Sequence, residues 1–298
     1  MSGSGALEIC RRLKAGRPNS LLTHRENSHG EETGQARQPD RMFNLVPSRN
    51  TEHDWGPQAA VSAGVVAAAP LALPASVDLR APWWDIGDQL TTGSCVGWSS
   101  TDGVARYHFV KANKLGKTEK LSPRFTWMAS KETDQFVNRP ETMIEGAGTS
   151  LKAAVDILRK YGAAPETLLP FKINTMMYTG PDDAFFATTA TRKIAGYFNL
   201  QRNVPNWRSW LATQGPILVG LSVDATWMNA TATNGLLDNF QPNTVRGGHA
   251  VAAVGYRTDG RIILRNSWGT SWGDKGFAYA SETYINAAFF PESYGITV

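Results

Sequence analysis

The sequence predicts an α+β protein that folds as two lobes, because helical patterns come first along the chain and strand patterns follow. A buried helix is expected from Ser94 to about Asn113, and a second helix from Thr149 to Lys160, where apolar residues recur at helical spacing. Beyond Thr188 the pattern changes to short strands. At 298 residues the chain can form one large domain or two modest ones.

The first 74 residues predict a leader that is partly disordered. Residues 1 to about 41 are polar, rich in Gly, Ser and Arg, and have no periodicity, so we expect little stable structure there. Residues 42–47 (MFNLVP) add a short apolar piece. The stretch 61–75 is rich in small residues and interrupted by two prolines, which is typical of a linker or of a strap over the surface.

Each predicted element that follows has a local signal. The helix that ends at Lys160 has Thr149 or Ser150 as its N-cap and Gly162 as its stop. Strands are expected at 216–223 (PILVGLSV), 249–256 (HAVAAVGY) and 261–265 (RIILR). The turn 258–260 (TDG) joins the last two and predicts an antiparallel hairpin.

The composition disfavours several classes of protein. Hydrophobic residues make up 42% and charged residues 19%, near ordinary globular values, so a disordered, fibrous or coiled-coil protein is not expected. The net charge of +4 is dispersed, which predicts no nucleic-acid partner. No apolar stretch of about 18 residues could span a bilayer, so we expect no membrane partner. Two cysteines and no signal-peptide core indicate a cytoplasmic location, with export by another route left open.

Cys95 lies at the predicted start of the first helix, directly after Gly93 and Ser94. The positive end of a helix and its free backbone N–H groups favour the thiolate, which is the form that attacks a carbonyl carbon. A lone cysteine is more often a small buried hydrophobe, so its position alone does not establish a nucleophile.

His249 and Asn266 supply the two groups that a nucleophilic thiol needs. They lie on the two strands of the predicted hairpin, which can bring them side by side. The side-chain oxygen of an asparagine accepts a hydrogen bond from the ring N–H that faces away from sulfur. Because this acceptor is neutral, the charge of the imidazolium remains to stabilise the thiolate.

From Leu73 to Val298 the chain resembles the papain-like cysteine peptidases, the papain and cathepsin family, in particular their compact bacterial-type members. The similarity is spread over motifs at 73–80 (LPASVDLR), Gln89 before Cys95, 121–123 (LSP), 148–149 (GT) with the helix up to Tyr161-Gly162, 170–171 (PF), 248–251 (GHAV) and the twelve-residue run 266–277 (NSWGTSWGDKGF). The length of the last motif makes a chance match negligible.

The resemblance implies a papain-like peptidase domain at 75–298, with a helical lobe at about 85–190, a β-rich lobe at about 191–298 and the active site in the cleft between them. It also implies a role for each of four residues. Cys95 would be the nucleophile, His249 the proton carrier and Asn266 the group that orients His249, while Gln89 and the backbone N–H of Cys95 would hold the oxyanion. No metal or organic cofactor is implied.

By the same resemblance the partner is a peptide or protein substrate. It would contact five residues, namely Gly148, Thr149, Leu151, Gly248 and Trp268. Leu151 matches a position that lines the pocket for the substrate side chain two residues before the cut, which predicts a preference for apolar residues there.

The chain departs from the family pattern in several places. Thr92 stands where the family has a cysteine, Val96 follows the nucleophile in place of an aromatic residue, and Thr149 replaces the second glycine of the substrate-binding loop. The stretch from Cys95 to His249 is also longer than the roughly 130–150 residues usual in this family. Inserted loops are therefore expected, at 174–191 and 226–246.

Three functions remain open from the sequence. An active endopeptidase is favoured because all four catalytic groups are present together. A thiol-dependent transferase or amidase on the same fold would pass the acyl group to an amine, and a catalytically silent binding relative would leave Cys95 unreactive. The leader is expected either to lie across the cleft and restrain a zymogen, or to pack on the catalytic domain as a strap that does not block it.

Overall fold

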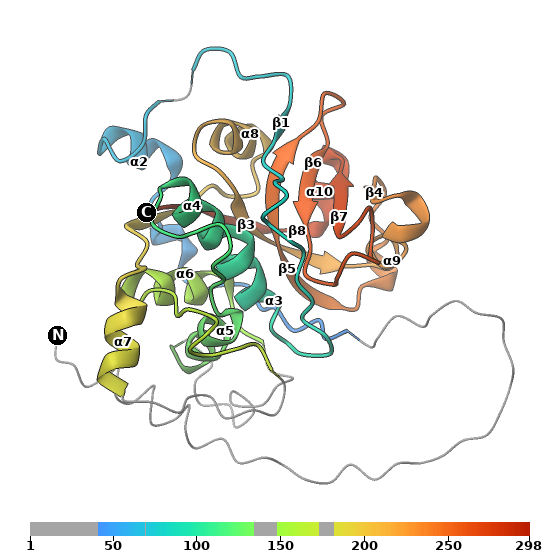
Figure 1. Ribbon diagram of the computed structural model, residues 1–298. Helices are drawn as coiled ribbons and strands as arrows, with labels where there is room; N and C mark the ends of the chain where they lie inside the picture. The colour runs from blue at the N-terminus through green and yellow to red at the C-terminus, as the bar shows by residue number, and fades with distance from the viewer. Residues whose placement is uncertain (1–40, 69, 134–147, 173–181) are drawn as a thin grey trace, which may run out of the picture.

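The computed structural model describes residues 41–68, 70–133, 148–172 and 182–298, and in it most of the helices that come before residue 191 gather on one side of the molecule (Figure 1). The predicted tail at 1–40 lies outside the described residues. The described helices up to residue 190 are η1 (Thr51–His53), α2 (Pro57–Ser62), α3 (Cys95–Gly97), η2 (Trp98–Ala105), α4 (Arg106–Lys111), α5 (Pro123–Thr133), α6 (Leu151–Lys160) and α7 (Asp182–Ala190).

An eight-stranded sheet forms the other side of the molecule (Figure 1). Its strands run in the order β2-β8-β3-β5-β6-β7-β4, and β1 pairs with β5 off this path. The strands are β1 (Val77–Asp78), β2 (Gly196–Asn199), β3 (Ile217–Val223), β4 (Leu236–Leu237), β5 (Gly247–Tyr256), β6 (Ile262–Arg265), β7 (Phe277–Ala280) and β8 (Phe289–Thr297).

Several sequence-based predictions are confirmed. Helix α6 begins after Ser150, whose side chain accepts a hydrogen bond from the backbone N–H of Ala153, and it ends just before Gly162, which has a φ of 94°. Strands β5 and β6 form the expected antiparallel hairpin. The predicted strand at 216–223 is β3.

The order of helices before strands is only partly right. Three helices lie among the strands, namely α8 (Val204–Thr213), α9 (Ala225–Met228) and α10 (Glu282–Ala288). Each begins at a polar N-cap: the side chains of Asn203, Asp224 and Ser281 accept hydrogen bonds from backbone N–H groups of the first turn. The 226–246 stretch holds short elements, α9, η4 (Ala230–Thr233), β4 and η5 (Pro242–Thr244). Of the 174–191 stretch, residues 174–181 lie outside the described residues and the rest is mostly α7.

The predicted helix at Cys95 is continuous through α3, η2 and α4, but its middle segment η2 has π-type hydrogen bonding. The hydroxyl of Ser99 donates to the Cys95 carbonyl at 2.7 Å, and that of Ser100 donates to the Val96 carbonyl at 2.6 Å. These bonds compete with the regular backbone bonds and explain the local widening of the helix. A Cβ on Gly97 would lie 2.3 Å from the Pro123 carbonyl oxygen, so glycine lets this helix approach α5.

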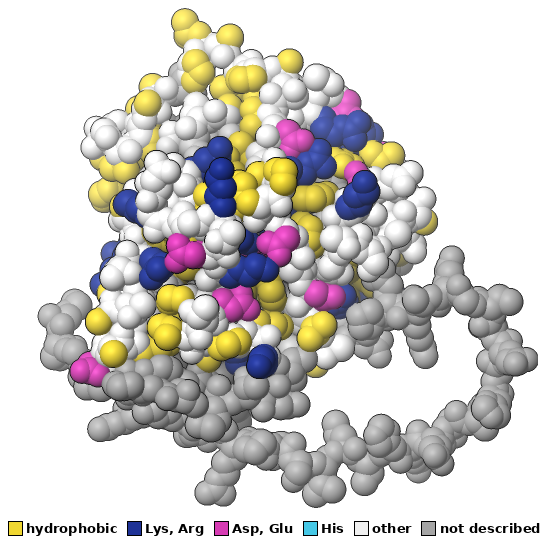
Figure 2. All heavy atoms as spheres, in the orientation of Figure 1, with side chains coloured by type: hydrophobic (Ala, Val, Ile, Leu, Met, Phe, Trp, Pro, Cys, Tyr) yellow, Lys and Arg dark blue, Asp and Glu magenta, His cyan; other side chains and the backbone are white. Residues whose placement is uncertain are grey.

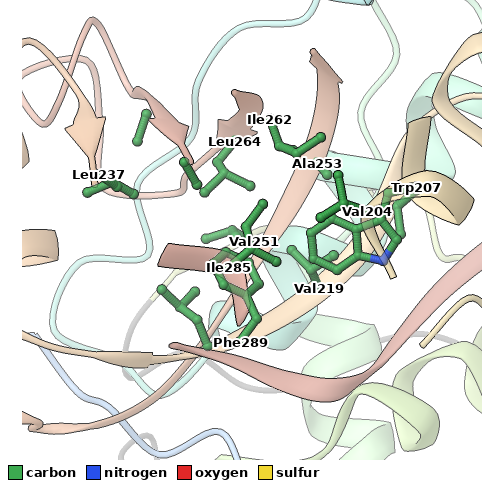
Figure 3. Close-up of a cluster of buried hydrophobic side chains, with 14 of the residues drawn as sticks. Val204, Trp207, Val219, Leu237, Val251, Ala253, Ile262, Leu264, Ile285 and Phe289 are labelled. Carbon is green, nitrogen blue, oxygen red and sulfur yellow. The ribbon is translucent and has the colours of Figure 1, made fainter. Parts of the chain in front are cut away.

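The sheet divides the core into two main clusters, because alternate side chains of a strand point to opposite faces. Val251 and Ala253 of β5 pack in the cluster that fills the β-rich lobe together with Trp207 and Phe289 (Figure 3). Ala252 and its neighbours on the opposite face pack against the helix of Cys95. The central strand β5 therefore contacts both the β-rich core and the helical side of the molecule.

The stretch between α2 and β1, for which the sequence predicts a linker or a strap, lies at the top of Figure 1. Apolar side chains of this stretch are exposed, Val65 and Leu71 among them, and the same place in Figure 2 shows hydrophobic side chains among white atoms. Elsewhere on the face shown, basic and acidic side chains are interspersed and form no continuous basic patch. None of the helices in the described ranges is long and apolar enough to cross a bilayer.

Candidate active site

Cys95 is the first residue of α3, and its side chain is fully buried. It packs in the same cluster as Ala250, the residue that follows His249 on β5. Burial raises the pKa of the Cys95 thiol to about 11, and backbone hydrogen bonds from Ala250 and Val96 oppose that rise. Cys95 is therefore a neutral thiol at neutral pH in this structure.

His249 and Asn266 meet as the hairpin predicts. Nε2 of His249 lies 2.8 Å from Oδ1 of Asn266, and the same oxygen accepts a hydrogen bond from the backbone N–H of Ser267 at 2.8 Å. An amide oxygen can only accept, so Nε2 carries the proton and Nδ1 of the neutral ring is an acceptor. Nδ1 is buried and has no hydrogen-bond partner within the described part of the chain. It is thus available to take a proton from a thiol.

The imidazole lies in an apolar environment. The ring of Trp268 lies 4.9 Å from that of His249, and the ring of Trp227 lies 5.7 Å from it. Burial lowers the pKa of His249 to about 4, the bond to Asn266 opposes this, and the guanidinium of Arg41 lowers it further. Both His249 and Cys95 are therefore held in their uncharged forms.

Gln89 is fully buried beside this pair of strands and is fixed at both ends of its amide. Its Oε1 accepts a hydrogen bond from the hydroxyl of Ser267 at 2.9 Å, and its Nε2 donates to the carbonyl of Thr92 at 3.0 Å. The amide nitrogen carries two hydrogens, so one remains for a further acceptor. Ser267, which positions Gln89, belongs to the motif that begins at Asn266 but was not identified as a site residue from the sequence.

Residues 41–48, which we call the leader strand, lie against all five residues that were expected to bind substrate. The backbone N–H of Leu45 donates to the Gly248 carbonyl at 3.1 Å, and that of Val46 donates to the Thr149 carbonyl at 3.3 Å. A Cβ on Gly148 would lie 2.2 Å from the carbonyl oxygen of Asn44. These contacts explain why small residues line the path of the strand.

The side chain of Leu45 fills a pocket at the expected apolar subsite. It is buried in one cluster with Leu151, and a Cβ on Gly220 would meet Leu45, Phe290 and Leu151 in turn. The sequence predicted Leu151 for this pocket but not Gly220 or Phe290, which lie on β3 and β8 and carry no recognisable motif. Beyond the pocket, the backbone N–H of Ser48 donates to a carboxylate oxygen of Glu292 at 2.6 Å.

At its other end the leader strand contacts Trp268. The ring of Phe43 lies 5.9 Å from that of Trp268, and the guanidinium of Arg41 lies 5.5 Å from the Trp268 ring. Arg41 also forms an ion pair with Asp88 at 2.6 Å. The sequence placed Arg41 at the end of an unstructured tail, because nothing near it in the chain indicates the distant carboxylate that orders it.

No group of three or more His, Cys, Asp or Glu side chains able to hold a metal ion occurs among the residues that the structure describes. The polar side chains at the cleft instead form the Cys95, His249, Asn266 and Gln89 arrangement. That arrangement suits proton transfer and nucleophilic attack by sulfur.

The chain is similar to curated proteins that are named as cysteine proteinases. Cysteine proteinase 2 of Entamoeba histolytica is 29% identical over 216 residues, which are 68% of this chain and 62% of the relative. The cathepsin L-like proteinase of Fasciola hepatica is 24% identical over 214 residues, 69% of this chain and 60% of the relative. The chain spans about three fifths of the length of these relatives.

Solved structures share the fold. Xylellain, a cysteine protease from Xylella fastidiosa, matches with a TM-score of 0.72 and 21% identity over 89% of this chain and 99% of the other. The digestive procathepsin L 3 of the Tenebrio molitor larval midgut matches with a TM-score of 0.53 and 16% identity over 88% and 76%. The expected α+β fold of two lobes is thereby confirmed. A family model described as papain family cysteine protease matches residues 73–290, most of the chain, and this chain therefore belongs to the papain family of cysteine proteases.

Proposed function

We propose that the protein hydrolyses peptide bonds, with Cys95 as nucleophile and His249 as the group that takes and returns the proton. The observation that carries this proposal is the 2.8 Å bond between His249 and Asn266, which leaves Nδ1 of the imidazole free at the cleft. Such a ring can accept the thiol proton from Cys95 while its other nitrogen stays hydrogen-bonded.

The reaction then proceeds in two halves. The thiol proton passes to Nδ1, the thiolate attacks the scissile carbonyl carbon, and the resulting oxyanion accepts hydrogen bonds from the Cys95 backbone N–H and the Gln89 amide. His249 passes its proton to the leaving amine as the C–N bond breaks, which leaves a thioester on Cys95. A water molecule gives a proton to Nδ1, attacks the thioester and restores the thiol as the carboxylic acid leaves.

The pocket that Leu45 fills supports a preference for an apolar side chain two residues before the cut. Leu151 and Phe290 line it, and Gly220 leaves room for a branched side chain. Burying a leucine contributes about 1.5–3 kcal/mol, enough to favour leucine over alanine in a substrate by about tenfold or more.

We further propose that the leader strand restrains this activity. Leu45 occupies the pocket, and Leu45 and Val46 use the backbone carbonyls of Gly248 and Thr149. In this family the substrate residues before the cut lie beside the loop at Thr149, so a substrate reaches this loop with its earlier residues. The leader strand reaches the same loop with its later residues. The leader strand therefore runs opposite to a substrate, and it blocks the cleft without presenting a bond for cleavage.

The experiment measures release of a fluorophore from a peptide amide that has leucine two residues before the cut, under reducing conditions. The rate for the unaltered chain is compared with the rates for two variants. Leu45→Asp is expected to raise the rate at least tenfold over the unaltered chain, because a charge is excluded from the apolar pocket. Val65→Asp places the same charge on an exposed residue between α2 and β1, outside the leader strand, and is the control, with no change expected.

Two further outcomes test the rest of the proposal. Cys95→Ala in the Leu45→Asp background is expected to abolish turnover, and turnover that survives would refute Cys95 as nucleophile. Equal rates for Leu45→Asp and the unaltered chain would refute the restraint. Mass spectrometry of the product with added hydroxylamine separates a peptidase, which forms the carboxylic acid, from a transferase, which forms only the hydroxamate.

A further inference from the structure

The guanidinium of Arg41 lies in a site that belongs to the body of the enzyme. Its Nη1 donates to a carboxylate oxygen of Asp88 at 2.6 Å and to the carbonyl of Leu90 at 2.7 Å, and its Nη2 donates to the carbonyl of Trp268 at 3.3 Å. The indole ring of Trp268 lies alongside at 5.5 Å. Although Asp88 is 39% exposed, the Arg41 side chain is only 3% exposed, so it is enclosed by its partners.

The partners of Arg41 are held in place by contacts that do not involve the leader strand. Asp88 and Trp268 form an antiparallel bridge, and the Leu90 backbone N–H donates to Asp88 Oδ1 at 2.8 Å. Leu90 has a φ of 55°, an uncommon conformation for a residue with a side chain. A Cβ on Gly269 would come within 3.2 Å of the other Asp88 oxygen, so glycine leaves space for the carboxylate. These contacts within the body of the enzyme fix the position of Asp88 where Arg41 meets it.

The site lies on the leaving-group side of the cleft. Asp88 precedes Gln89 and Trp268 follows Asn266 by two residues, whereas the loop at Thr149 lies at the opposite end of the leader strand. Since the Thr149 side takes substrate residues before the cut, the Asp88 side takes residues after it.

On the basis of the proposed peptidase function, we infer that Asp88, the Leu90 and Trp268 carbonyls and the Trp268 ring form a subsite for an arginine side chain of the substrate, within the first three residues after the scissile bond. Arg41 occupies this subsite in the restrained enzyme. Three acceptors in different directions and an aromatic face match the planar fork of arginine better than the compact ammonium of lysine. The substrate class is a peptide with an apolar residue before the cut and arginine after it.

The test uses the full chain with Arg41→Ala and Leu45→Asp, which empties both subsites, and Arg41→Gln with Leu45→Asp as a second version with a smaller change. Internally quenched peptides carry leucine two residues before the cut and either arginine or citrulline at the first, second or third position after it. Citrulline keeps the size of arginine and removes its charge. The ratio of kcat/KM for arginine over citrulline is expected to be about tenfold at one position, because charge-assisted hydrogen bonds are roughly twice as strong as neutral ones.

Asp88→Asn in the same background is expected to lower this ratio to about one, while Asp183→Asn, an exposed carboxylate of α7, is expected to retain it. Binding of the same peptides to the chain that carries Cys95→Ala together with Arg41→Ala and Leu45→Asp, measured by fluorescence anisotropy, separates the subsite from the activity. If the arginine peptide binds more tightly than the citrulline peptide and this difference depends on Asp88, the subsite is supported even when no turnover is seen. In that case only the proposed peptidase function fails. Equal binding or equal cleavage of the arginine and citrulline peptides overturns the subsite.

Discussion

Single side chains decide the protonation state of the site. Cys95 and His249 are both uncharged beneath the leader strand, because burial raises the pKa of the thiol to about 11 and lowers the pKa of the imidazole to about 4. The thiolate and imidazolium form needs water or a polar substrate near the pair. In the proposed restraint, the leader strand would therefore act in two ways: it would block substrate and it would disfavour the charged form of the nucleophile.

Gln89 permits a sharp test of oxyanion stabilisation at this scale. Gln89→Glu keeps the size of the side chain and an oxygen acceptor for Ser267, but removes the amide donor. In the Leu45→Asp background, kcat is expected to fall by about 10²–10³ with little change in KM, because the donor acts only when the oxyanion forms.

Alkylation of Cys95 by iodoacetamide is the control for Gln89→Glu, since this reaction forms no oxyanion and is expected to keep its rate. Gln58→Ala, at an exposed position on α2, controls for general effects of the substitution. Equal losses of hydrolysis and alkylation would show that Gln89 acts on the nucleophile instead.

At the scale of elements, a buried ion pair joins the helix of Cys95 to the strand that leads to Asn266. Asp102 of η2 pairs with Arg265 of β6 at 2.6 Å and with Arg106 of α4 at 3.1 Å, and all three side chains are almost completely buried. Arg265 directly precedes Asn266, so this contact also fixes how the two catalytic elements lie relative to each other.

Asp102→Asn is expected to lower the free energy of unfolding by about 3–5 kcal/mol, because it leaves the buried guanidinium of Arg265 without its anion and Arg106 with only the half-exposed Asp85. Urea denaturation measures the loss. Asp259→Asn is the matched control: Asp259 also pairs with two arginines, Arg257 and Arg261, but at an exposed turn, where about 1 kcal/mol or less is expected. Similar losses in the two variants would contradict a structural role for the buried pair.

Local signals explain which elements could be predicted from the sequence. Helix α6 combines regular apolar spacing with the Ser150 cap, and the β5–β6 hairpin has a clear turn, so both follow from nearby residues. Strand β8 contains Pro291 and Glu292 and has no alternating pattern of apolar and polar residues. Its position is set by pairing with β2 and β3, so it could not be predicted from nearby residues. The π-type segment of the Cys95 helix depends on hydroxyl groups whose effect on the backbone is not visible in a pattern of apolar residues.

At the scale of the whole molecule, the cleft combines residues that local motifs reveal with others that they do not. The His249–Asn266 contact was predictable because a hairpin joins the two residues. The Arg41–Asp88 contact was not, since it joins two ordinary surface residue types 47 positions apart with no shared pattern. The contacts of the leader strand with the active-site residues are therefore the main feature that could not be predicted from the sequence.

The leader strand and the protonation of His249 are thermodynamically linked, which predicts release of the leader strand in acid. While it is docked, the pKa of His249 is lowered to about 4, and Arg41 contributes to this; once it leaves, water returns and the pKa rises toward its ordinary value of 6.5. The docked form thus binds fewer protons between these two values. Its stability is fully present above about pH 6.5 and is lost as the pH falls toward 4, by up to about a hundredfold in the docking equilibrium at about pH 4.5.

Hydrogen exchange of residues 41–48 measures this release, because the backbone N–H groups of Leu45 and Val46 are hydrogen-bonded only while the leader strand is docked. After correction for intrinsic exchange, protection of these amides is expected to fall between about pH 7 and pH 4.5, while that of β5 stays high. His249→Gln removes the titrating group and is expected to abolish the pH dependence in this range. Protection that is unchanged by acid, or a fall that persists in His249→Gln, would show that His249 does not couple protonation to docking.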